Sequence, residues 1–163
     1  MDQPTIDKLA HQFMVNAVSV QPGQNIWIEH SGPGGVAIAQ ACAEKVKALG
    51  ANPYVMDRGS DYMNAFLPGK TDAELEAQGQ AELAKMKTMQ GYIRVGDDAD
   101  QGRVSASQED RARYQKLVMR PLTQHRVENT NWLVTRAPTA EFAQACGMDM
   151  PTFEQFYIGA NLA

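Results

Sequence analysis

The chain has 163 residues, of which 44% are hydrophobic and 21% are charged, a composition typical of one folded globular domain. Its net charge of −4 and its lack of any run of Lys and Arg argue against a nucleic-acid partner, because binding to phosphates depends on clustered cations. No apolar run approaches the ~18 residues of a membrane-spanning helix, so a membrane partner is not expected either.

Apolar spacing predicts helices and strands in alternation along the chain. The opening helix begins near Pro4, a residue that suits a first helical turn, and a Pro-Gly turn at residues 21–24 separates it from the first strand. Gly50 is placed to end the second helix in the left-handed conformation. The predicted helices span residues 4–20, 36–49, 71–89, 105–127, 139–146 and 150–158, and the predicted strands span residues 25–30, 52–57, 91–96 and 132–135.

This alternation predicts an α/β fold: a single three-layer domain over residues 1–163, with a mainly parallel sheet of about four or more strands flanked by helices. Residues 58–70 have no clear period and are expected to be a looser connection. Gly79 should weaken the third helix by roughly 1 kcal/mol relative to Ala, and Pro121 should kink or divide the fourth.

The segment of residues 30–35, His-Ser-Gly-Pro-Gly-Gly, lies between the first strand and the following helix. In parallel sheets this position faces ligands, because the first amides of a helix attract anions. The segment has neither the G-x-G-x-x-G spacing of a dinucleotide site nor the Gly-Lys-Ser/Thr of a phosphate loop. A tight structural turn is therefore favoured over a phosphate site, and His30 is expected to be a solvent-facing or hydrogen-bonded loop residue rather than a metal ligand.

The residue types that usually hold metals do not occur at metal-site spacing. The three histidines are far apart, and neither H-E-x-x-H nor Cys-x-x-Cys is present. Asp97, Asp98 and Asp100 resemble a cation loop but lack its Gly and its distant Glu, so a solvated turn is favoured. We therefore predict no metal ligand and no catalytic residue in this chain.

Arg136 leaves the fourth predicted strand at a rigid turn, where Pro138 keeps the preceding residue extended and Thr139 can cap the next helix. Two interpretations are open. Arg136 pairs with an Asp of a neighbouring loop, or it faces a substrate cleft, in which case Arg136, Pro138, Thr139 and His30 are the candidate residues of that cleft.

The two cysteines give information on the cellular compartment of the protein. Cys42 and Cys146 both lie in helix-like apolar segments, which predicts buried free thiols in a reducing cytoplasm. Residues 1–4 lack the basic and apolar regions of a secretory signal. A cytoplasmic location is expected.

Three stretches, in this order, resemble the thermophilic-type metalloaminopeptidases, the aminopeptidase T and aminopeptidase S group. Residues 20–29, VQPGQNIWIE, resemble the family's V-x-P-G-x turn into its first strand. Residues 48–55, ALGANPYV, are similar to its A-G-A-x-x-V turn into the second strand. Residues 131–148, NWLVTRAPTAEFAQACGM, are the most specific match, and residues 153–157 continue it.

The resemblance implies an N-terminal domain of a leucyl-type aminopeptidase, a hydrolase that removes N-terminal residues from peptides. In that family a pair of divalent metal ions (Zn, Co or Mn) is held by Glu, His and Asp residues of a second, C-terminal domain. No position of this chain corresponds to those ligands, so we expect the catalytic domain and the cofactors to lie outside it. The resemblance also implies a peptide substrate through the complete enzyme and a homodimer.

Two alternatives stay open at this point. The first is a stand-alone α/β module that binds a small ligand or a partner chain at the strand ends near residues 32–35 and Arg136. The second is the N-terminal domain of a ring-cleaving non-heme iron dioxygenase, because those dioxygenases look like relatives of the same family.

Overall fold

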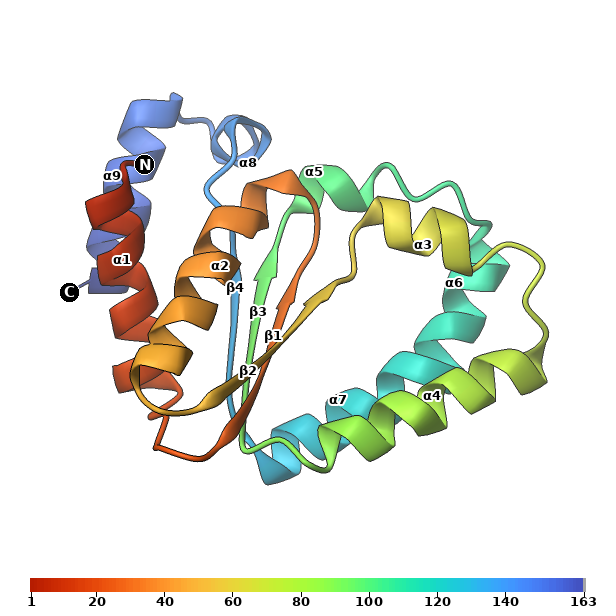
Figure 1. Ribbon diagram of the computed structural model, residues 1–163. Coiled ribbons are helices and arrows are strands. Elements are labelled where there is room, and N and C mark those ends of the chain that lie inside the picture. Colours follow the sequence, from red (N-terminus) through yellow and green to blue (C-terminus); the bar gives the residue numbers. More distant parts are fainter. Residues whose placement is uncertain (163) are drawn as a thin grey trace.

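Four parallel strands form one sheet in the order β2-β1-β3-β4 in the computed structural model, which describes residues 1–162 (Figure 1). The strands are β1 (Asn25–His30), β2 (Asn52–Asp57), β3 (Gly91–Gly96) and β4 (Asn131–Arg136). The helices are α1 (Gln3–His11), α2 (Pro33–Ala48), α3 (Ser60–Phe66), α4 (Asp72–Met86), α5 (Asp98–Gln101), α6 (Gln108–Tyr114), α7 (Arg120–Asn129), α8 (Ala140–Ala145) and α9 (Met150–Leu162), with two π-helical segments, η1 (Gln12–Ala17) and η2 (Gln115–Met119).

The two central strands are mostly buried and mostly apolar, with helices packed on both faces of the sheet, as expected for a parallel sheet. Neighbouring side chains of a strand point to opposite faces, so Ile26 and Ile28 of β1 pack on one helical layer while Trp27 packs on the other. The predicted three-layer α/β domain with a parallel sheet is therefore confirmed. The strand order reverses between β1 and β3, which is where such folds usually bind ligands.

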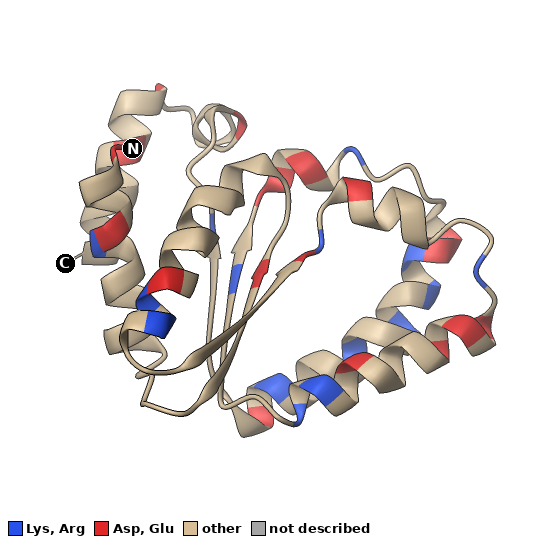
Figure 2. Ribbon diagram, in the orientation of Figure 1, with Lys and Arg blue, Asp and Glu red and all other residues tan. Residues whose placement is uncertain are grey.

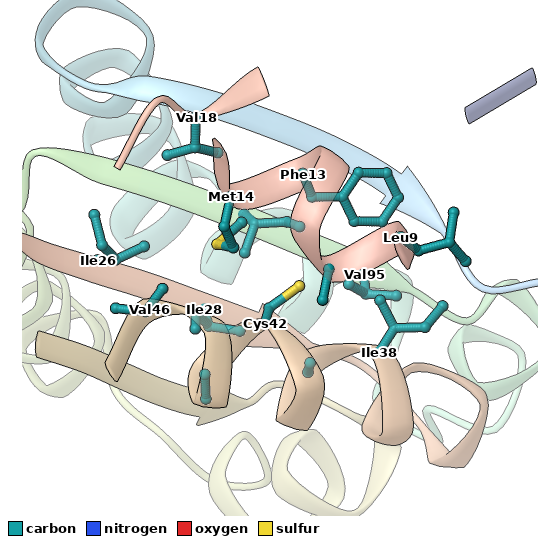
Figure 3. Close-up of a cluster of buried hydrophobic side chains, with 14 of the residues drawn as sticks. Leu9, Phe13, Met14, Val18, Ile26, Ile28, Ile38, Cys42, Val46 and Val95 are labelled. Carbon is teal, nitrogen blue, oxygen red and sulfur yellow. The ribbon is translucent and has the colours of Figure 1, made fainter. Parts of the chain in front are cut away.

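The first layer consists of α1, η1 and α2, and its core is drawn in Figure 3. Phe13 and Met14 of η1 and Ile38 of α2 are buried against the sheet. Complete burial of each such side chain contributes about 1.5–3 kcal/mol. Helix α9 lies along the outer side of α1 (Figure 1), and the Met1 ammonium group lies 3.1 Å from a Glu154 oxygen.

The second layer covers only part of the other face. Met86 of α4 and Leu122 of α7 pack on Trp27 and Tyr92, toward the amino ends of the strands. From there α3, α6 and η2 continue around a separate small core with α4, which includes Tyr114. Figure 1 shows these helices as an arc that leads away from the sheet.

Apart from shifts of a few residues at helix ends, four stretches differ from the prediction. The predicted helix at residues 4–20 is divided into α1 and η1 and ends at Ala17. The connection at residues 58–70 contains α3, and the turn expected around Asp97, Asp98 and Asp100 contains the one-turn α5. The predicted helix at residues 105–127 is divided into α6, η2 and α7, with Pro121 in the first turn of α7. The backbone stays helical across both junctions, and the wider π-helical turn η2 just before Pro121 accommodates a residue that has no amide hydrogen to donate.

The cysteine prediction is half right. Cys42 lies in the core, where burial raises the pKa of its thiol to about 12, whereas Cys146, at the end of α8, is exposed. The prediction that both thiols are buried is wrong for Cys146, because α8 buries Ala143 and leaves its last turn open. Within residues 1–162, no helix combines the length and the apolar character needed to cross a membrane.

Candidate functional site

Two buried aspartates, Asp97 and Asp100, connect the loops at the carboxyl ends of β1, β2 and β3 through hydrogen bonds. The Asp97 carboxylate accepts a hydrogen bond from the Gly34 amide at 3.0 Å, and the Asp97 amide donates to Ser31 Oγ at 3.1 Å. Asp100 accepts hydrogen bonds from the backbone amide and the hydroxyl of Ser60, each at 2.7 Å. Figure 2 shows how acidic residues gather in this region.

The prediction of a solvated turn at Asp97, Asp98 and Asp100 is therefore wrong for the first and the third. Asp97 and Asp100 are each only 4% exposed, while Asp98 between them faces solvent. Burial of a carboxylate is tolerated when amides and hydroxyls replace its water. These donors come from the loops after β1 and β2, which a local sequence pattern does not reveal.

The loop at residues 30–35 is a tight turn filled by its neighbours. Gly32 has a φ of 71°, and a Cβ atom at this position would collide with the side chain of Asp100. A Cβ atom on Gly34 would lie 2.6 Å from Thr139 Cγ2. The Asp97 carboxylate already occupies the first amide of α2, which makes this helix end less suited to the phosphate of a ligand. The close packing of Gly32 and Gly34 supports the structural interpretation of the loop.

His30 is half-buried at the end of β1, with its Nδ1 atom 3.7 Å from Asp57 Oδ1. The same Asp57 oxygen accepts a hydrogen bond from the Gly59 amide at 2.8 Å. Among residues 1–162, no three His, Cys, Asp or Glu side chains converge in a way that could hold a metal ion. His30 therefore lies beside Asp57 in the loop cluster, and its buried Nδ1 atom makes no hydrogen bond within the described residues.

Arg136 pairs with Asp98 of α5, its Nε atom 3.2 Å from Asp98 Oδ2, and both side chains are more than half exposed. Its guanidinium group also lies over the ring of Phe142, 5.4 Å from the centroid. Pro138 is buried, and Thr139 caps α8 by accepting the Phe142 amide at 3.2 Å.

The four candidate cleft residues therefore do not converge on one point. Thr139 approaches the loop at residues 30–35 through Gly34, while Arg136 is engaged with α5 and α8. The ion pair between Arg136 and Asp98 agrees with the first of the two interpretations of Arg136, a pair with an Asp of a neighbouring loop.

A second polar cluster, which the sequence analysis missed, lies between the sheet and the helices α4 and α6. Arg58, directly after β2, has its Nε atom 3.0 Å from Glu29 Oε2 and donates through Nη2 to Glu82 Oε2 at 2.7 Å. Gln78 donates to the other Glu82 oxygen at 2.9 Å. The Arg58–Glu29 contact is close in distance but not aligned as a hydrogen bond, so it acts mainly through charge.

Arg58 stays charged although the cluster is buried. Glu29 is fully buried, and Arg58 and Glu82 are 4% and 6% exposed. Burial alone would lower the pKa of Arg58, but the charges of Glu29 and Glu82 outweigh burial and raise it, so the guanidinium group keeps its proton. Arg58 also donates to the hydroxyl of Tyr114, and burial raises the pKa of that phenol.

A cavity of about 140 Å³ opens beside this cluster, between the sheet and the helices α3, α6 and η2. Three guanidinium groups line it, those of Arg58, Arg94 and Arg111. The sequence did contain one signal of this site. Glu29 directly follows the apolar run of residues 26–28 in β1, and a buried carboxylate requires a cationic partner or several hydrogen-bond donors.

The comparisons bear on the fold. No protein-family model and no curated protein matches the chain. Wild-type AmpT from Thermus thermophilus has a similar fold, with a TM-score of 0.65 at 17% identity over 98% of this chain and 43% of that chain. This chain therefore spans less than half of AmpT. CurK enoyl reductase (TM-score 0.35, 10% identity, 95% of this chain and 48% of that chain) and an alcohol dehydrogenase superfamily protein from Novosphingobium aromaticivorans (0.36, 12%, 96% and 47%) are too dissimilar to support an argument.

Proposed function

We propose that this chain is the N-terminal domain of a metal-dependent aminopeptidase that releases N-terminal residues, preferentially leucine, from peptides. The observation that carries the proposal is the similarity in fold to AmpT, a thermophilic aminopeptidase, over nearly the whole of this chain. The three stretches that resemble the metalloaminopeptidases support it, because they fall at β1, at β2 and from β4 into α8, in the same order along the chain.

The proposal assigns the chemistry to a domain outside these 163 residues. A bound pair of divalent ions would polarise the scissile carbonyl and activate water there. The residues of this chain do not fit such a pair, since no group of suitable side chains converges within residues 1–162. Its own part would be structural: to wall the substrate cavity and to support a homodimer, in the cytoplasm.

Exposed apolar side chains around the β4 edge support this structural role. Trp132 and Val134 on β4 and Val127 on α7 are 44%, 45% and 48% exposed. An edge strand with exposed apolar residues is normally covered in the native assembly. In the proposal, the second domain or the second protomer covers it.

The test is to recover the natural product from its source cells with an antibody against this chain. We expect an intact mass well above twice the 17.9 kDa of this chain and hydrolysis of Leu-anilide that a chelator abolishes. The purified 163-residue chain should not hydrolyse Leu-anilide with Zn²⁺, Co²⁺ or Mn²⁺. A natural product near 18 kDa, or hydrolysis by the purified chain, would overturn the proposal.

A stand-alone binding module is the second candidate, and the arginine-lined cavity favours it. Binding at the carboxyl edge of the sheet is less well supported, because the Asp97 carboxylate already accepts the Gly34 amide and the Asp100 carboxylate already accepts two hydrogen bonds from Ser60. A natural product near 18 kDa that binds a ligand without metal would favour this candidate.

A further inference from the structure

The cavity next to the buried ion pairs has one side rich in polar donors and one apolar side. Arg94, Arg111, Gln101 and Gln115 form the polar side, in addition to Arg58. Met63, Val104 and Met119 contribute the apolar side. A concave site with a few converging polar groups on an apolar wall is the usual form of a small-molecule site.

The charges around the cavity do not balance. Three guanidinium groups line the cavity and only two carboxylates, Glu29 and Glu82, pair with any of them, so the formal count leaves one positive charge over. Arg58 donates hydrogen bonds to Glu82 and lies within ion-pair distance of Glu29. Arg94 is held less tightly, because its Nε atom lies 3.7 Å from Glu29 Oε1 and makes no hydrogen bond within the described chain.

Arg111 is also free to bind a ligand. Its Nε atom donates to the Ala106 carbonyl at 2.9 Å, which fixes the base of the guanidinium group. Across residues 1–162, no hydrogen bond or ion pair involves the terminal guanidinium nitrogens of Arg94 or Arg111. Such forked donors bind planar carboxylates through two parallel hydrogen bonds.

The volume of the cavity and its surplus charge restrict the class of ligand that fits it. The volume of about 140 Å³ is below the ~300 Å³ of typical drug-sized sites, which favours a molecule of few atoms. A single surplus positive charge favours a monoanion over a phosphate dianion, and the methionine and valine wall favours a short hydrocarbon tail. We propose that this cavity binds a small monocarboxylate with a short aliphatic chain. The proposal does not depend on the aminopeptidase assignment.

The first experiment titrates 3-methylbutanoate into the purified chain by calorimetry. Its neutral isostere 3-methylbutanamide and inorganic phosphate serve as comparison ligands at matched ionic strength. We expect saturable binding of one carboxylate per chain and binding of the amide and of phosphate at least about tenfold weaker, because a hydrogen bond to a charged group is worth more than tenfold in affinity. Absence of saturable binding, equal binding of the amide, or tighter binding of phosphate would overturn the proposal.

Three variants locate the site. Arg94→Gln and Arg111→Gln should each weaken binding of 3-methylbutanoate about tenfold or more. Arg120→Gln removes the same charge from an exposed position at the start of α7 that does not line the cavity, and it should leave the affinity unchanged. Arg111 is itself exposed, so its variant keeps the test valid even if Arg94→Gln does not fold. If all three variants lose affinity equally, or if none of them loses affinity, the ligand does not bind in this cavity.

Discussion

Arg58 holds two carboxylates inside the protein, and its position explains how a fully buried Glu29 can occur in the central strand. Glu29 lies on β1, Glu82 on α4, and Arg58 at the end of β2 joins them. A buried ion pair contributes little net stability compared with a well-packed apolar group, but removal of one partner leaves the other charge uncompensated.

We therefore predict that Arg58→Met lowers the free energy of unfolding by about 3–5 kcal/mol, since Glu29 and Glu82 would be left buried without their cation. Arg136→Met is the matched control. It removes a pair in which both side chains are more than half exposed, and such pairs contribute at most ~1 kcal/mol. Urea denaturation of both variants measures the difference. A loss below about 1 kcal/mol for Arg58→Met would mean that Arg58 is not what stabilises the carboxylates.

At the scale of elements, β1, β2 and β3 begin and end at the residues that the sequence predicts. Their runs of apolar and β-branched residues are long enough to define a strand, and turn residues bound them on both sides. The helices α3 and α5 were missed because they are too short to show a helical period. Long-range contacts stabilise them instead, such as those of Asp100 with the start of α3.

Gly79 shows why propensity alone misjudges a helix. The sequence treats this residue as a weak point of α4, and a Gly→Ala change in a helix is normally stabilising by roughly 0.5–1 kcal/mol. In the structure, however, a Cβ atom on Gly79 would collide with the backbone carbonyl of Leu117 in η2. Glycine is therefore needed for the close approach of α4 to η2.

We predict that Gly79→Ala is destabilising by about 1–3 kcal/mol, because backbone atoms cannot yield as a flexible side chain can. Gly159→Ala is the control, since Gly159 lies inside α9 with open space around it and should gain up to about 1 kcal/mol. Thermal unfolding of the two variants should move in opposite directions. A stabilised Gly79→Ala protein would show that α4 and η2 pack less closely than described.

At the scale of the whole molecule, the fold was predictable and the arginine cavity was not. The alternation of strands and helices determines the layers, and it was readable locally. The cavity depends on how Arg58, Arg94 and Arg111, which are far apart in the chain, are brought together by sheet order and by the arc of helices. The same reason explains why Asp97 and Asp100 were taken for solvated residues.

Burial of titratable side chains also makes the stability of the whole fold depend on pH. Burial raises the pKa of the Cys42 thiol to about 12 and raises the pKa values of Tyr62, Tyr92, Tyr114 and Tyr157. In the unfolded chain a thiol titrates near 8.5 and a phenol near 10. Above those pH values the unfolded state binds fewer protons than the native state, so the free energy of unfolding must fall as pH rises.

We predict that on the alkaline side stability begins to decline near about pH 8.5, because the Cys42 thiol then ionises in the unfolded chain alone, and declines more steeply above about pH 10, where the four tyrosines do the same. Each group that is protonated only in the native state contributes about 1.4 kcal/mol per pH unit. Urea denaturation between about pH 8 and pH 11 gives the curve, and tyrosinate absorbance should rise together with unfolding. In Cys42→Ala the steep decline above about pH 10 should remain, and the decline between about pH 8.5 and pH 10 should disappear. A variant whose curve still falls between about pH 8.5 and pH 10 as the parent does would show that the Cys42 thiol is not the group responsible.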